Sequence, residues 1–127
     1  LKECKLVDEA SFDAKVKAPL EMKSNWIDRH KLKNTDELKD VLSTYDNIKA
    51  VICGHVHQDS LNVWKNIHFL STPSTSVQFK PLSFDFALDN IAPGYRCLLL
   101  KDNGEFSTAV HRVQKFRQKF SKEISGY

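Results

Sequence analysis

One sequence feature most constrains the fold of this 127-residue chain. It is a helical repeat followed directly by an apolar run, a glycine and two histidines. The repeat consists of four apolar residues at the spacing of one helix face: Leu38, Val41, Leu42 and Tyr45. It predicts a helix over residues 35–45, with Asn34 and Glu37 placed as in a capping box. Residues 48–53 (IKAVIC) are mostly apolar and β-branched, which predicts a central strand buried on both faces. Helix and strand together form half of an α/β unit.

The residues directly after that strand are the first candidates for a functional site, because ligands of α/β sheets bind beyond the carboxyl ends of the strands. Gly54 predicts an unusual turn or a close approach of two backbones. On extended backbone, His55 and His57 would present both imidazoles on one side. Paired neutral imidazoles suit Zn, Fe or Mn. From this pattern alone, the two histidines are as consistent with an ordinary polar pair as with a metal site.

The second half of the chain predicts a mixed sheet with hairpins. Turn residues separate apolar runs at two places, and Asn-Gly is among the strongest hairpin signals. The expected hairpins are residues 61–64 with 67–70 around the turn 65–66, and 95–101 with 106–113 around the turn 102–104. A loop rich in Ser, Thr and Pro over residues 71–76 leads to Val77, Gln78 and Phe79. The predicted fold class is therefore α/β.

Composition limits the classes of protein to which the chain can belong. Hydrophobic residues make up 41% and charged residues 28%, as in a globular domain. No apolar stretch approaches the roughly 18 residues of a membrane span, and residues 1–12 lack a secretory signal. Cys4, Cys53 and Cys97 are odd in number and form no CxxC, so we expect a reduced, cytoplasmic protein. The chain lacks an initiator methionine, since its only methionine is Met22, as expected of a fragment or of a processed chain.

Longer motifs connect the chain with a known family. AVICGHVHQ, residues 50–58, resembles the GHxH motif that closes the metal site of calcineurin-like metallophosphoesterases. The runs WIDRHKLKNTDELKDVL, STPSTSVQFKP and FALDNIAPGYRCLLLKDNGEFSTAVHRV are similar to bacterial class III 3′,5′-cyclic-nucleotide phosphodiesterases. The resemblance covers residues 19–127 and leaves 1–18 unassigned. It implies the C-terminal half of an αββα sandwich.

The resemblance also implies a reaction, namely metal-dependent hydrolysis of cyclic AMP to 5′-AMP. Two divalent metal ions, Fe or Mn, would take part, with His55 on one metal and against the substrate and His57 on the other. The family's DxH, GDxxD and GNHD-like motifs are missing from the sequence. The histidine expected before Pro19 is missing too, because residues 14–18 read AKVKA. We therefore assign no catalytic residue and expect the chain alone to be inactive, with partial or no metal occupancy.

Other polar and aromatic residues have simpler interpretations. We expect His30 to be a loop residue, His68 and His111 to be strand residues without chemistry, and Trp26 and Trp64 to lie in the core rather than stack on a base. A phosphate-binding role for the loop hydroxyls is less favoured than turn formation. These hydroxyls belong to Ser71, Thr72, Ser74, Thr75 and Ser76.

Two other functions remain open from the sequence. The first is a nucleic-acid-binding module that uses a tail in which basic residues alternate with aromatics, although the net charge is only +3. That tail comprises Arg112, Lys115, Phe116, Arg117, Lys119, Phe120 and Lys122. The second is a phosphoesterase-like interaction module without catalysis. Because the missing half of the family's domain would supply partner strands for residues 48–53, we expect the chain alone to form a homo-oligomer through strand edges or by exchange of residues 1–25.

Overall fold

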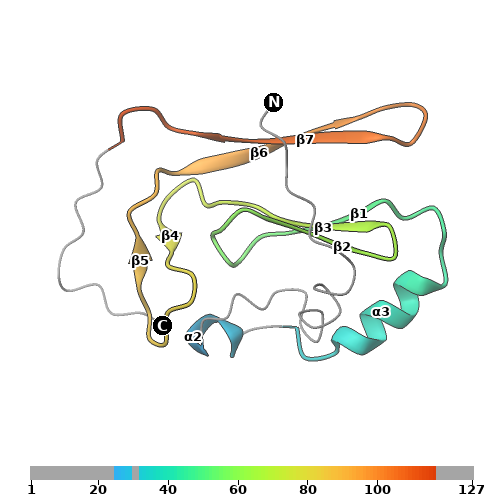
Figure 1. Ribbon diagram of the computed structural model, residues 1–127, viewed down its shortest axis with the longest axis horizontal. Helices are drawn as coiled ribbons and strands as arrows, with labels where there is room; N and C mark the ends of the chain where they lie inside the picture. The colour runs from blue at the N-terminus through green and yellow to red at the C-terminus, as the bar shows by residue number, and fades with distance from the viewer. Residues whose placement is uncertain (1–24, 30–31, 117–127) are drawn as a thin grey trace.

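A computed structural model describes residues 25–29 and 32–116 (Figure 1). It contains two helices and seven strands within these ranges, a mixed α/β arrangement as predicted. Expectations for residues 1–24, for His30 and for residues 117–127 lie outside the described residues. The elements are α2 (Asn25–Asp28), α3 (Thr35–Ser43), β1 (Ala50–Cys53), β2 (Ser60–Trp64), β3 (Ile67–Ser71), β4 (Gln78–Phe79), β5 (Leu88–Asp89), β6 (Gly94–Leu100) and β7 (Phe106–Arg112).

Helix α3 confirms the predicted helix but begins without a capping box. The side chain of Asn34 donates to the Glu37 carboxylate at 3.2 Å instead of accepting from the helix backbone. The first helical bond runs from the Leu38 N–H to the Asn34 carbonyl at 3.1 Å. The helix ends at Ser43, two residues before the predicted end, and Tyr45 is exposed. The helix is therefore fixed by burial of Leu42 rather than by its cap.

Strands β1, β3 and β2 form a three-stranded sheet in that order. Strand β3 pairs with β1 in parallel and with β2 in antiparallel fashion. The β2–β3 hairpin confirms the predicted one, and both turn residues have positive φ, 46° at Lys65 and 64° at Asn66. A turn with two positive φ angles matches the right-handed twist of the strands. The sheet is therefore mixed. The tight β2–β3 hairpin gives the antiparallel pair, and β1 and β3, which are not consecutive in the chain, form the parallel pair.

The prediction that residues 48–53 form a central strand buried on both faces is wrong for the described part of the chain. Strand β1 begins at Ala50 and pairs there with β3 alone. Val51 packs against apolar neighbours, whereas Ile52 points to the other face and is 47% exposed. Apolar composition predicts a need for cover, but it does not say which residues provide that cover.

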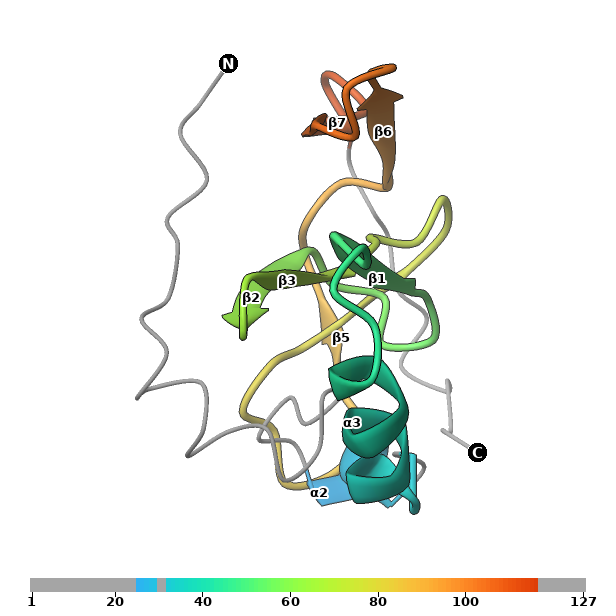
Figure 2. The ribbon, with the colours of Figure 1, turned by 90° about the vertical axis from the view of Figure 1, so that its right-hand side faces the viewer.

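Two further pairs of strands complete the described structure. Strand β4 follows the predicted loop, and neither this strand nor its partner β5 was predicted. Strands β6 and β7 confirm the second predicted hairpin, called here the C-terminal hairpin, with Gly104 at φ 81° in its turn. Figures 1 and 2 show the C-terminal hairpin and α3 on opposite sides of the three-stranded sheet. The full αββα sandwich remains a prediction.

Apolar side chains form two separate clusters. The helix-side cluster has Leu42, Trp64, Ile67 and Phe69 buried at its centre, with Leu38, Ile48 and Val51 around them. The turn-side cluster has Ile27, Val56 and Phe79 at its centre, with Trp26, Val77, Phe86 and Leu88 around them. Neither described helix is long and apolar enough to cross a membrane.

Candidate functional site

The two histidines lie in a tight turn, not on extended backbone as predicted. This histidine turn, residues 54–58, follows the carboxyl end of β1. The Val56 N–H donates to the Gly54 carbonyl at 2.9 Å, and His55 between them has φ 71°, so these residues form a γ-turn. His57 also has positive φ, 52°. The turn places Val56, which is 1% exposed, in the turn-side cluster.

The unusual backbone conformation falls on the histidines rather than on the glycine. Gly54 has no positive φ, and a Cβ atom built on it would meet nothing within 4 Å. The sequence-based reason for this glycine is therefore wrong. A residue with a side chain costs about 1–2 kcal/mol in the left-handed region. Because Val56 must be buried, the strain lies on His55 and His57.

The imidazole of His57 is fixed by two contacts with residues 77–79. Nδ1 lies 3.0 Å from the Val77 carbonyl oxygen, which can only accept, so Nδ1 carries the proton. In the neutral ring the lone pair is then on Nε2, a nitrogen able to bind a metal or accept a proton. The ring also stacks on Phe79, with centroids 4.1 Å apart and planes at 10°. Both the tautomer and the orientation are thus determined.

Burial favours the neutral form of His57. Desolvation lowers the pKa of His57, the charge of His55 lowers it further, and the bond to Val77 acts in the opposite direction. The neutral imidazole is the form that binds metal ions. His55 itself is exposed and lies two residues before His57 in the same turn. Their roles as ligands remain predictions.

The described residues do not complete a metal site. Within the described ranges, no three His, Cys, Asp or Glu side chains lie together as a metal ion requires. Burial raises the pKa of Cys53 although Arg96 opposes it, which disfavours the thiolate. Asp59, the nearest acidic residue in sequence, is bound to Arg112 at 2.8 Å. The two imidazoles therefore fit only part of a coordination sphere, and any carboxylate ligand must come from other residues.

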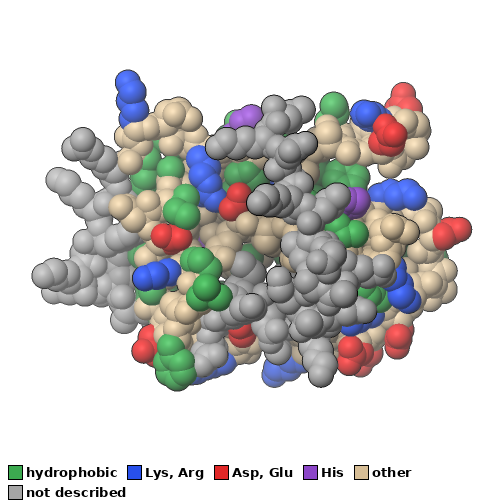
Figure 3. Space-filling model, viewed as in Figure 1, with side chains coloured by type: hydrophobic (Ala, Val, Ile, Leu, Met, Phe, Trp, Pro, Cys, Tyr) green, Lys and Arg blue, Asp and Glu red, His purple; other side chains and the backbone are tan. Residues whose placement is uncertain are grey.

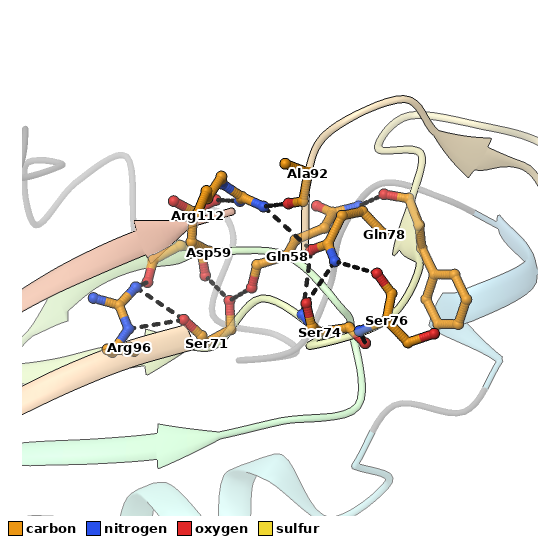
Figure 4. Close-up of polar contacts among 11 residues, drawn as sticks. Gln58, Asp59, Ser71, Ser74, Ser76, Gln78, Ala92, Arg96 and Arg112 are labelled. Carbon is orange, nitrogen blue, oxygen red and sulfur yellow. Dashed lines mark hydrogen bonds and ion pairs between the residues drawn. The ribbon is translucent and has the colours of Figure 1, made fainter. Parts of the chain in front are cut away.

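Hydrogen bonds beneath the histidine turn join it to β3 and β4 (Figure 4). The Gln58 side chain donates to the Phe79 carbonyl at 2.7 Å. The Ser71 hydroxyl donates to the Gln58 carbonyl at 2.7 Å and lies 2.7 Å from the Ser60 hydroxyl. Ser71 is a buried residue at the end of β3, not the loop residue that the sequence predicted. The hydroxyls of Ser60 and Ser71 therefore form hydrogen bonds within the protein.

The structural roles of two arginines of the C-terminal hairpin were missed by the sequence analysis, which named Arg112 only as a basic residue of the tail and did not name Arg96. Arg96 donates from Nε and Nη2 to the Ser71 carbonyl at 3.1 and 2.9 Å, and from Nη1 to the Thr108 hydroxyl at 3.1 Å. Arg112 binds Asp59 at 2.8 Å and the Ala92 carbonyl at 2.7 Å. Their partners lie 12 to 53 residues away along the chain, so no local pattern could have identified them.

Among the described residues, the simpler interpretation agrees with the positions of His68, His111 and both tryptophans. His68 is a β3 residue whose Nδ1 lies 3.3 Å from the Lys49 carbonyl, and His111 stacks on Tyr95 in the C-terminal hairpin. Trp64 is buried in the helix-side cluster, and Trp26 lies against Phe79 in the turn-side cluster. Both tryptophans are therefore core residues.

The structure describes only the first part of the basic tail, up to Phe116. Arg112 is engaged with Asp59, so its charge is already compensated. Lys115 and Phe116 are exposed, and the rest of the tail lies outside the described residues. On the face drawn in Figure 3, acidic and basic side chains lie interspersed. Such mixing does not favour a polyanion on that face.

A pocket of about 290 Å³ lies at the other end of the three-stranded sheet. Its walls include Ile48 and Lys49 before β1, and Asn66 before β3. Because β1 and β3 are parallel, these residues mark the amino ends of both strands, whereas the histidine turn follows the carboxyl end. The pocket and the histidine turn are therefore separate places.

Comparison with known proteins identifies relatives of the chain. It is 46% identical over 95 residues to the 3′,5′-cyclic adenosine monophosphate phosphodiesterase CpdA of Vibrio vulnificus, covering 75% of the chain and 35% of that protein. The CpdA proteins of Escherichia coli and Pseudomonas aeruginosa are 42% and 38% identical over 109 residues, 86% of the chain and 40% of each relative.

No protein-family model matches the chain. The chain spans only 35–40% of the length of these three relatives. The similarity nevertheless extends over most of the chain, well beyond the GHxH motif. Over its aligned residues, the chain is therefore similar to bacterial 3′,5′-cyclic-nucleotide phosphodiesterases.

Proposed function

We propose that this chain contributes His55 and His57 to a two-metal site that hydrolyses 3′,5′-cyclic nucleotides, with cyclic AMP as substrate and 5′-AMP as product. The relatives bear the name of this activity. The observation that carries the proposal is the bond from His57 Nδ1 to the Val77 carbonyl at 3.0 Å. It presents a neutral Nε2 beyond the carboxyl end of β1, where ligands of α/β sheets bind.

The chain's own part in the reaction is to hold two imidazoles in place. His57 would bind one metal ion through Nε2, and exposed His55 would bind the other and contact the substrate phosphate. Fe or Mn would supply the Lewis acid chemistry. Since the described residues provide no carboxylate beside the histidines, we propose that the remaining ligands lie on further residues of a longer protein. The chain alone should then be inactive.

The proposal is tested by alanine variants of the protein that carries these remaining ligands. His57→Ala and His55→Ala should each reduce cyclic AMP turnover at saturating Mn²⁺ by more than about 100-fold, because loss of a direct ligand costs more than loss of its outer partner. His111→Ala is the matched control, since His111 is exposed and stacks on Tyr95. Equal losses in all three variants would show that the site is misassigned. An unaltered protein that does not hydrolyse cyclic nucleotides would instead be a non-catalytic interaction module.

Inactivity of the isolated chain is tested directly with cyclic AMP and added Mn²⁺ or Fe²⁺. We expect no turnover above the metal-only control. Robust turnover by the 127-residue chain would show that its own residues complete the site.

We also propose that the isolated chain self-associates and that it acts in the cytoplasm. The argument for self-association is that Ile52 on β1 is 47% exposed and that β1 pairs only with β3 among the described residues, which favours edge-to-edge contact. The argument for the cytoplasm is that Cys53 and Cys97 are free thiols, consistent with a reducing compartment. Light scattering at micromolar concentration should give a mass above 14.6 kDa, and a monomer would refute the association.

A further inference from the structure

We propose that Arg112 is a positioning residue that fixes the tautomer and orientation of His57 from the C-terminal hairpin. The consequence for catalysis rests on the proposed function, whereas the effect on the imidazole does not. The two residues are 55 positions apart in sequence and are joined through Asp59 and Gln78 (Figure 4).

Both restraints on His57 come from one short segment. The Val77 carbonyl accepts from Nδ1, and the Phe79 ring stacks on the imidazole. This segment includes β4, which is only two residues long and pairs with the two residues of β5. So short a ladder cannot fix the segment alone. The position of His57 therefore depends on what else holds residues 77–79.

Gln78, between the two restraints, fixes this segment together with burial of Phe79 and the bond from Gln58 to the Phe79 carbonyl. Gln78 is 2% exposed, and its amide donates to the Ser74 carbonyl at 2.7 Å. Its Oε1 accepts from the Ser74 N–H at 3.2 Å and from Arg112 Nη1 at 3.4 Å. A buried amide with these partners has one favourable orientation, because each lost bond would leave a desolvated polar group. Arg112 thus helps to fix the residue from which both restraints extend.

Arg112 also fixes the far end of the histidine turn. Its Nη2 binds the Asp59 carboxylate at 2.8 Å, directly after Gln58, while Nη1 donates to the Ala92 carbonyl at 2.7 Å. One guanidinium therefore contacts both the chain that carries His57 and the strand that restrains it. The planar fork of arginine allows this geometry, which the single ammonium of lysine cannot reproduce.

The side chain of Arg112 fits beside the neighbouring strand because the residue opposite it is a glycine. Arg112 lies opposite Gly94 in the β6–β7 ladder. A Cβ atom at Gly94 would lie 2.6 Å from the His111 carbonyl and 3.0 Å from Arg112 Cγ. The glycine thus makes room for the arginine side chain.

The test is the tautomer of His57 in the ¹⁵N-labelled chain, read from long-range ¹H–¹⁵N correlations of the imidazoles at neutral pH. The unaltered chain should show His57 in the Nδ1–H form. Arg112→Met should give a mixture of tautomers and a loss of the ring-current shift from Phe79, with Arg112→Lys in between. Lys101→Met, in an exposed ion pair elsewhere in the same hairpin, is the matched control and should leave His57 unchanged.

His68 is an internal reference in each spectrum, because its Nδ1 also lies near a carbonyl, that of Lys49, and it contacts the C-terminal hairpin through Phe106 rather than through the bonds of Arg112. A change in His57 with His68 unaltered supports the proposal. A folded Arg112→Met chain with an unaltered His57 overturns it, as does an equal change in both histidines, which would indicate general loosening.

If Arg112→Met does not fold, Asp59→Asn decides the question, since it preserves the size of the side chain and removes only the charge that Arg112 binds. A smaller change in His57 in the same direction is expected, and an unaltered His57 would overturn the proposal. The outcome is independent of activity, so failure of the proposed function, seen as unchanged turnover in His57→Ala, would leave the tautomer result intact.

Discussion

The residues of the helix-side cluster lie close together in the sequence, whereas those of the turn-side cluster come from segments that lie farther apart. The helix-side cluster combines α3 with the β2–β3 hairpin, which follows it closely in sequence. The turn-side cluster combines α2, the histidine turn and the β4–β5 region, so its members span residues 26 to 88. Its aromatic rings meet edge to face, with Trp26 and Phe79 centroids 4.8 Å apart.

The two clusters therefore have different roles: the helix-side cluster stabilises the fold, and the turn-side cluster also positions the imidazole of His57. The helix-side cluster is built from apolar side chains alone, and it stabilises the sheet on which the rest depends. The turn-side cluster buries Val56 between two histidines and stacks Phe79 on His57. Substitutions in the first cluster should therefore change the free energy of unfolding, and those in the second should also change the imidazole.

The largest effect is expected in the helix-side cluster. Leu42→Ala should lower the free energy of unfolding by about 2–5 kcal/mol, because Leu42 is buried and its removal leaves a cavity. Its neighbour Val41, 56% exposed, provides the control, and Val41→Ala should change stability by less than about 0.5 kcal/mol. Urea denaturation measures both. Equal losses would contradict the orientation of α3.

Gly94→Ala should have the next largest effect. The added methyl group would meet the His111 backbone carbonyl, so the C-terminal hairpin must shift, at a cost of about 1–3 kcal/mol. Because Arg112 lies opposite, the His57 tautomer should change as well. A stability loss without any change at His57 would weaken the link between hairpin and histidine turn.

Phe79→Leu tests the turn-side cluster itself. Loss of the ring contacts should cost about 1 kcal/mol, and the ring-current shift of His57 should disappear. The matched control is Phe84→Leu, since Phe84 is 69% exposed, and His57 should keep its shift in that variant. Nuclear magnetic resonance and thermal unfolding measure the two quantities. A retained shift in Phe79→Leu would contradict the stack.

The smallest effect is expected at Gly54. Gly54→Ala should change stability by less than about 0.5 kcal/mol, because the new methyl group has open space and φ is not positive. Loss of more than about 2 kcal/mol, measured by thermal unfolding, would show that the histidine turn requires a glycine after all.

Local patterns were sufficient to predict the regular elements. The helical spacing of Leu38 and Leu42 located α3, and the turn residues located both hairpins, because these structures depend on neighbours within a few positions. The histidine pair was found for the same reason, since two histidines beyond an apolar strand form a local pattern. The cover of β1 and the strands β4 and β5 were beyond prediction, because pairing and cover depend on residues far along the chain.

The sequence by itself thus determined the elements, the candidate histidines and the similarity to a family. Only the tertiary structure decided the left-handed backbone of His55 and His57, the bond from His57 to Val77, and the part played by Arg112. The physical reason is one of distance. Burial of Val56 sets the turn, and a carbonyl 20 residues from His57 selects its tautomer. Those partners come together only when the chain folds.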